Sequence, residues 1–172
     1  MDNNVMKKLK IDKVTVNIGA GESGDKLDKA KKILQTLTNR TPVLTTARQR
    51  VQTFGIRKGD QIGVKVTLRR KTAEEFLAKA FDTIDFKISK KAFDKFGNFS
   101  FGIKQYIDFP GIRYDPSVGL VGFDVCVTVM KPGYRVVLRK HKRSRIPNSQ
   151  RGTREESIAL IKEKFNVSTI ES

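Results

Sequence analysis

The sequence predicts an α+β fold of the two-layer sandwich type, in which about three helices pack on a mixed, mostly antiparallel sheet of about five strands, with long basic loops. Segments that alternate between apolar and polar residues predict the strands, and segments with apolar residues three and four positions apart predict the helices. The two kinds occur in mixed order along 172 residues. A chain of this length buries roughly 70% of its unfolded surface, so a single domain over 1–172 is expected.

The first part of the chain predicts a strand, a helix and two further strands. Alternating apolar residues predict the opening strand over 9–18, and helical spacing predicts a helix over 27–37 that ends near Asn39. Residues 43–46 predict a short strand. Strict alternation over 62–68 predicts another strand, whose second face is polar and basic.

The second part of the chain predicts two helices separated by two strands. The sequences at 72–75 and 153–156 both have the Thr-x-x-Glu pattern of a capping box, so each is expected to begin a helix. Alternation predicts strands over 99–103 and 120–130. The last residues, 168–172, are expected to fray.

Net charge is the most informative feature for function. The chain has a formal net charge of +17, and two windows account for all of it. The rest of the chain is electrically balanced. Crowding like charges costs self-repulsion, which a polyanionic partner relieves, so nucleic acid is the expected partner. The basic residues of the windows 40–71 and 131–154 are Arg40, Arg48, Arg50, Arg57, Lys58, Lys65, Arg69, Arg70, Lys71, Lys131, Arg135, Arg139, Lys140, Lys142, Arg143, Arg145, Arg151 and Arg154.

The composition points to a cytoplasmic globular protein. One cysteine, Cys126, permits no internal disulfide, and the start of the chain lacks the apolar stretch of a signal peptide. Apolar runs are strand-sized, far below the ~20 residues that span a bilayer, so no membrane partner is expected.

Several patterns suggest enzyme chemistry but fail when tested. Residues 19–24 fit GxGxxG between a strand and a helix, yet the next strand ends in threonines and arginine, and no acidic residue is placed to bind a ribose. His141 lies among cations, and Cys126 is expected to be a small buried thiol in a strand. No cofactor, metal site or catalytic residue is therefore predicted, and the protein is expected not to be an enzyme.

A group of phenylalanines allows two interpretations. The rings could stack on unpaired bases, as aromatic side chains do on RNA-binding sheets, or they could pack in the core. Because two of them alternate with small polar residues, core packing is favoured. The group is Phe93, Phe96, Phe99 and Phe101.

The order of several motifs resembles the universal large-subunit ribosomal protein family number five, in its archaeal form. The runs FGIRKG at 54–59 and IGVKVTLR at 62–69 are the most specific, and the match extends over essentially the whole chain. Bacterial members commonly have Gln at the position of Arg40 and Gly at that of Arg70. The remaining matching segments are 14–22, 41–43, 98–102, 108–111, 114–116, 124–127 and 132–136.

The resemblance implies a structural component of the large ribosomal subunit. It implies binding to 5S ribosomal RNA, which the protein would anchor in the central protuberance, and contacts with the P-site transfer RNA and a protein of the small-subunit head. Large-subunit ribosomal RNA and neighbouring large-subunit proteins are further implied partners.

The resemblance also implies three groups of contact residues. The 5S RNA contacts would be Asn17, Arg40, Lys65, Thr67 and Arg69. A mobile basic loop at 47–61 would contact transfer RNA through Phe54, Gly55, Ile56, Arg57 and Lys58. The basic segment 131–154 would contact other ribosomal RNA through Arg139, Lys140, Lys142, Arg143 and Arg145.

Two other classes of function remain as alternatives. A protein-interaction or assembly module could use the same basic faces to bind acidic partner proteins, and specific binding to one RNA over others of equal charge separates it from an RNA-binding protein. A nucleotide-dependent enzyme would instead show saturable binding of NAD or ATP.

Overall fold

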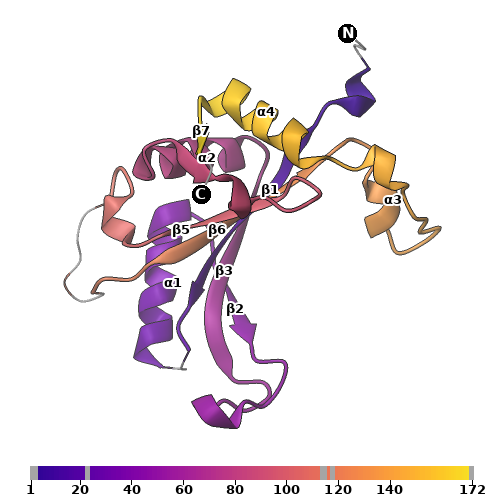
Figure 1. The fold of residues 1–172 in the computed structure, drawn as a ribbon. Coiled ribbons are helices and arrows are strands. Elements are labelled where there is room, and N and C mark those ends of the chain that lie inside the picture. Colours follow the sequence, from indigo (N-terminus) through magenta and orange to yellow (C-terminus); the bar gives the residue numbers. More distant parts are fainter. Residues whose placement is uncertain (1–3, 22–23, 113–115, 117–118, 171–172) are drawn as a thin grey trace. The chain divides into compact units, whose positions relative to one another are not determined.

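The computed structural model describes residues 4–21, 24–112, 116 and 119–170 (Figure 1). The chain folds into two compact units, each assembled from segments distant in the sequence. We call them the terminal unit and the central unit. The terminal unit comprises Met1–Val14, Arg69–Ser100 and Val127–Ser172, and the central unit comprises Thr15–Leu68 and Phe101–Cys126.

The larger sheet has five strands in the order β2-β3-β1-β6-β5. β2 and β3 are antiparallel, with Val43 opposite Lys65. The α+β sandwich and the predicted strands are confirmed, although β6 begins at Phe123 and not at 120 because the Val121 carbonyl accepts a hydrogen bond from the Tyr106 N–H, outside the strand. The five strands are β1 (Lys10–Gly19), β2 (Val43–Thr46), β3 (Gln61–Arg69), β5 (Phe99–Ile103) and β6 (Phe123–Met130).

A second sheet, absent from the sequence prediction, pairs β4 (Lys87–Ser89) with β7 (Ser168–Ile170) in parallel. Most of the predicted frayed tail is therefore a strand, because the Ser168 N–H and hydroxyl both donate to the Phe86 carbonyl and fix the chain beside β4. Residues 171 and 172, which complete that predicted tail, lie outside the described residues.

The described residues form four α-helices, one more than expected. α3 is a single short turn inside the basic segment. α1 ends as predicted, with Asn39 in the left-handed region at φ 50° and its N–H donating to the Gln35 carbonyl. The helices are α1 (Asp25–Thr38), α2 (Arg70–Thr83), α3 (Arg135–Leu138) and α4 (Arg154–Phe165). Short 3₁₀ turns occur at Val5–Lys7, Gln52–Phe54, Lys90–Ala92, Tyr106–Asp108 and Asn148–Gln150.

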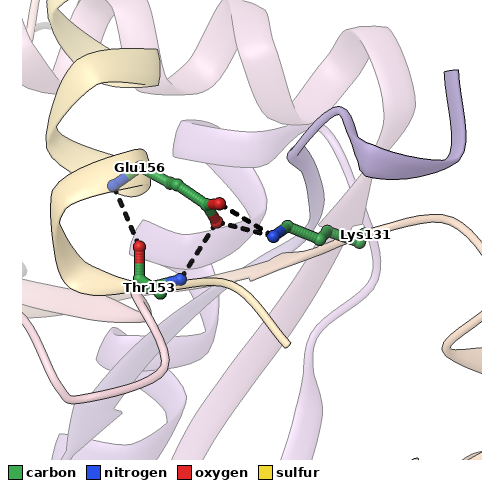
Figure 2. Close-up of polar contacts among 3 residues, drawn as sticks. All are labelled: Lys131, Thr153 and Glu156. Carbon is green, nitrogen blue, oxygen red and sulfur yellow. Dashed lines mark hydrogen bonds and ion pairs between the residues drawn. The ribbon is translucent and has the colours of Figure 1, made fainter. Parts of the chain in front are cut away.

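The two predicted capping boxes have opposite outcomes. At α4 the box is confirmed: the Thr153 hydroxyl accepts from the Glu156 N–H at 3.3 Å, and the Glu156 carboxylate accepts from the Thr153 N–H at 3.2 Å (Figure 2). The prediction of a capping box at 72–75 is wrong. β3 runs to Arg69 and α2 begins at Arg70, so Thr72 already lies inside the first turn and cannot act as the N-cap.

The core of the central unit lies between α1 and one face of the sheet (Figure 1). Val16 and Ile18 of β1 and Val64 and Val66 of β3 are almost fully buried, as is Leu34 of α1. Burying side chains of this size contributes about 1.5–3 kcal/mol each relative to leaving them exposed. Alternation along these strands therefore fixes which face of β1 and β3 points away from the core.

Aromatic packing organises the terminal unit. Phe81 is fully buried, and its ring centroid lies 6.3 Å from that of Phe99 and 5.1 Å from that of Phe165. Phe93 also packs on Phe99, with centroids 5.1 Å apart. Core packing is thus confirmed for Phe93 and Phe99, whereas Phe96 is half-buried beneath the Arg151 guanidinium at 4.8 Å.

Gly97→Ala tests the packing of the terminal unit. Gly97 has φ +83°, and an added Cβ would overlap the Ser157 hydroxyl and lie 2.8 Å from the Thr153 carbonyl oxygen. Backbone strain and overpacking together should lower the free energy of unfolding by about 3 kcal/mol. Gly111→Ala is the matched control, since its φ is +89° with no atom within 4 Å, and it should cost only about 1 kcal/mol. Urea denaturation measures both, and equal costs would contradict the packing described.

Arg70→Gly tests the junction of β3 and α2. Arg70 has φ 57°, a conformation that costs a side-chain-bearing residue about 1–2 kcal/mol and glycine almost nothing. The substitution should raise the free energy of unfolding by about 0.5–1 kcal/mol, after the added freedom of the unfolded chain is deducted. Lys71→Gly, one position further along the helix, should instead lower it by about 1 kcal/mol. Thermal denaturation measures the stability of both variants. A loss of stability in both would contradict the left-handed conformation described for Arg70.

Candidate nucleic-acid interface

Three of the predicted contact residues lie together on one face of the sheet. β1 and β3 are neighbours, and the side chains of Asn17, Lys65 and Thr67 alternate with buried residues of the two strands. They therefore share the face opposite the core, which we call the open face. Lys65 and Thr67 are exposed and Asn17 is half-buried. An amide, a hydroxyl and an ammonium group can donate to phosphate and ribose oxygens.

The other two residues of this group are Arg69, the last residue of β3, and Arg40, which follows α1. The Nη1 atom of Arg69 donates to Asp12 Oδ1 at 3.0 Å, and its side chain remains 56% exposed. Arg40 is exposed in the turn after α1. Because β2 runs antiparallel to β3 with Val43 opposite Lys65, the chain before Val43 leads toward the Thr67 end of β3. The register thus places Arg40 toward that end, although Arg40 lies outside the strands.

An apolar side chain on the open face was missed by the sequence analysis. Val43 is 61% exposed and lies opposite Lys65. β2 has four residues, too few for alternation to show which of its side chains face outward.

The predicted loop at 47–61 forms the end of a hairpin that extends from β2 and β3 (Figure 1). The Ala47 N–H donates to the Asp60 carbonyl at 2.8 Å, and Val51 and Ile56 exchange backbone hydrogen bonds of 3.0 and 3.1 Å. Gln61 already belongs to β3. A network of backbone hydrogen bonds therefore shapes the segment, and its mobility stays a prediction.

The tip of this hairpin presents an aromatic ring and two cations. Phe54 is 76% exposed, and Gly55 adopts φ 67°, which turns the chain sharply beside it. Arg57 and Lys58 are exposed, and the Arg57 N–H donates to Asp60 Oδ2 at 2.7 Å. Ile56 differs from the other predicted contacts, because it is half-buried and pairs with Val51 across the hairpin.

Some cations of the basic segment 131–154 are fixed within the terminal unit. Lys131 forms an ion pair of 2.8 Å with Glu156, as Figure 2 shows. Arg151 lies over the Phe96 ring, and Arg154 donates to the Lys90 carbonyl. These side chains stabilise the fold, so they are less available to a partner.

The predicted ribosomal-RNA contacts of this segment are instead displayed at the surface. Lys140, Lys142, Arg143 and Arg145 are exposed, as is Arg139, whose Nε donates to the Lys142 carbonyl at 2.7 Å. That hydrogen bond closes the chain around residues 139–142, where Lys142 has φ 51°. The structure thus gathers Arg139, Lys140 and Lys142 in one short turn, and Arg143 follows it directly.

The described part of the chain contains no group of three histidine, cysteine, aspartate or glutamate side chains that could hold a metal ion. No described helix combines the length and the apolar character that crossing a membrane requires.

The prediction that Cys126 is a buried thiol is wrong, because its side chain is exposed on β6. Cys126 alternates with Val125 and Val127, which are buried on the core side of the strand.

Charge segregated onto an exposed sheet face, a hairpin tip and a surface segment is typical of proteins that bind nucleic acid. Comparison with known proteins also points to this class of protein. Residues 4–57 match the family model of ribosomal protein L5, and residues 61–159 match the model of the C-terminus of the same ribosomal family. The chain belongs to the ribosomal protein L5 family.

Archaeal relatives match over nearly their whole length. The large ribosomal subunit protein uL5 of Sulfolobus acidocaldarius is 49% identical over 98% of this chain and 94% of its own. The protein of the same name from Methanococcus vannielii is 54% identical over 96% of this chain and 93% of its own.

Cys126 provides a test of the environment on the exposed side of β6. Partial burial, and to a lesser extent the Asp124 carboxylate, raise the pKa of the Cys126 thiol. A raised pKa lowers the thiolate fraction at a given pH, so alkylation by iodoacetamide should require higher pH than for an unstructured cysteine peptide. Asp124→Asn should shift the pH profile downward, without reaching the peptide's. Identical profiles for the native chain and the peptide would contradict this environment.

Proposed function

We propose that this chain binds 5S ribosomal RNA through the open face of β1 and β3 and helps to anchor that RNA in the central protuberance of the large subunit. Membership of the ribosomal protein L5 family supports a structural, non-enzymatic role in the large subunit of the cytoplasmic ribosome. The observation that carries the RNA proposal is the grouping of Asn17, Lys65 and Thr67 on one exposed face.

The chemistry of the open face suits recognition of RNA by its shape and backbone. A-form RNA hides its base edges in a deep major groove and displays hydroxyls and phosphates across a shallow minor groove. Thr67 and Asn17 can bond to ribose hydroxyls, while Lys65 supplies charge to phosphates. Arg69, oriented by Asp12, extends this cationic surface along the strand.

The hairpin tip suits a second, sequence-tolerant RNA contact, which we assign to the P-site transfer RNA. Arg57 and Lys58 are exposed cations for phosphates, and the exposed Phe54 ring can stack on any base. A component that accepts every transfer RNA needs contacts of this kind, because backbone and stacking contacts carry little sequence information.

The exposed turn at 139–143 and Arg145 are assigned to large-subunit ribosomal RNA. These residues are densely charged, and no acidic residue lies near them in the sequence. Such a segment favours contacts with phosphates. A protein of the small-subunit head and neighbouring large-subunit proteins complete the proposed set of partners, on the basis of the family resemblance.

Two double variants test this division of labour. Asn17→Ala with Thr67→Ala should weaken 5S RNA binding by roughly 1–3 kcal/mol in total, because two net hydrogen bonds are lost from an exposed face that the core does not need. Arg57→Ala with Lys58→Ala should leave 5S binding unchanged and weaken transfer-RNA binding in the assembled subunit. Electrophoretic mobility shift and filter binding measure the two affinities.

Each double variant serves as the control for the other, since all four substituted side chains lie outside the buried core and both variants should retain the native unfolding temperature. Loss of 5S binding on removal of Arg57 and Lys58 would overturn the separation of the two sites. If 5S binding is unchanged without the Asn17 and Thr67 side chains, the 5S contact does not lie on the open face.

A further inference from the structure

The terminal unit contains a hollow of about 750 Å³, whose lining shares Arg145 with the ribosomal-RNA contacts proposed above. Its walls come from the N-terminal 3₁₀ turn Val5–Lys7, the segment that follows β6, and the residues around 145–150. The volume falls in the range of roughly 300–1,000 Å³ that is usual for small-ligand pockets.

Apolar side chains that remain partly accessible to solvent form one wall of the hollow. Tyr134, Val136 and Ile146 are half-buried, and Met6 is 55% exposed. Gly133 has φ +90°, and an added Cβ would lie 3.4 Å from the Met6 Cε. The chain thus brings the Met6 side chain close to the turn that carries Tyr134, and the hollow is lined by both an aromatic ring and a thioether, two groups that favour contact with a flat ring.

The charge of the hollow is positive. Its one carboxylate, Glu156, already binds Lys131 Nζ at 2.8 Å and the Thr153 N–H at 3.2 Å (Figure 2). Lys131 therefore offsets Glu156, and Arg145 gives the lining a net positive charge. An anionic ligand is favoured.

Side-chain amides complete the lining. Asn4 accepts from the Met6 N–H at 3.0 Å through Oδ1, which orients its amide group, and Gln150 supplies a second, exposed amide. Amides both donate and accept, as the hydrogen-bonding edge of a nucleobase requires.

We propose that this hollow binds an unpaired nucleotide of ribosomal RNA, with the base against Tyr134 and Met6 and its phosphate beside Arg145. The inference rests on the proposed RNA contact of the basic segment, and it adds recognition of a single base to a surface otherwise suited to phosphates. Single-stranded RNA is bound in this way elsewhere, through unstacked bases on aromatic side chains and cations on the backbone. A base-paired nucleotide would not fit, because its stacking faces are covered by its neighbours.

The test is a titration of the full chain, carrying ¹³C-methyl methionine, with three probes. The probes are a short oligoadenylate strand, a blunt RNA hairpin with the same number of phosphates, and a peptide that alternates aspartate with leucine. We expect the Met6 methyl signal to shift saturably with the single strand and hardly at all with the hairpin. Tyr134→Ala should weaken single-strand binding roughly 5- to 150-fold, the loss typical of one base stack, whereas Tyr134→Phe should retain it.

Leu138→Ala is the matched control, because Leu138 is a 67% exposed apolar residue of the same segment outside the lining. It should bind as the native chain does. If the Met6 signal shifts equally with the single strand and the hairpin, and Tyr134→Ala does not weaken binding, the hollow does not bind an unpaired nucleotide. The basic segment would then bind RNA through its phosphates alone. A larger Met6 shift with the acidic peptide would make the hollow a peptide site. If neither RNA binds the chain at all, the proposed RNA contact of this segment fails as well.

Discussion

The alternation of side chains along β1 and β3 is the constraint on which the rest of the structure depends. Val16, Ile18, Val64 and Val66 must face α1 to leave water, and a strand that points every second residue inward points the others outward. A shift of one residue in register would bury Lys65 and expose the core valines, so the open face is fixed by the same packing energy that holds the central unit together.

The described cations of the hairpin tip and of the basic segment 131–154 differ in what surrounds them. Lys131, Arg151 and Arg154 are engaged by a carboxylate, an aromatic ring and a backbone carbonyl of the terminal unit. The cations of the hairpin tip and of the turn at 139–143 are exposed. Net charge alone does not separate these groups. The difference follows from the fold, which fixes Lys131, Arg151 and Arg154 against other segments of the terminal unit and leaves the cations of the hairpin tip and the turn at the surface.

Local sequence rules predicted the elements whose signals are strong. Strict alternation was sufficient for β3, and the Thr153 capping box was sufficient for the start of α4. The same rule failed at Thr72, because a strand that continues to Arg69 determines where α2 can begin. The pairing of β7 with β4 joins residues about 80 positions apart, and three-residue strands have no periodicity from which to predict them. Non-local pairing and three-residue strands are therefore what the sequence alone could not supply.

The candidate site was predicted in part for the same reason. Asn17 and Thr67 came from the resemblance, and alternation explains why they meet on one face. Val43 and the hollow beside Tyr134 were not anticipated, since both depend on contacts between segments far apart in the chain.

The proposed recognition of 5S ribosomal RNA can be tested by binding of the purified, nuclease-treated chain to that RNA, in competition with an unrelated structured RNA of equal length across a salt series. If about six phosphates are engaged, the logarithm of the affinity should fall with the logarithm of salt concentration with a slope of about −4 to −5. Binding to 5S RNA should persist to higher salt concentration than binding to the competitor RNA. Equal decay for both RNAs would mean that only charge is recognised, and would favour a protein that uses its basic faces to bind acidic partner proteins.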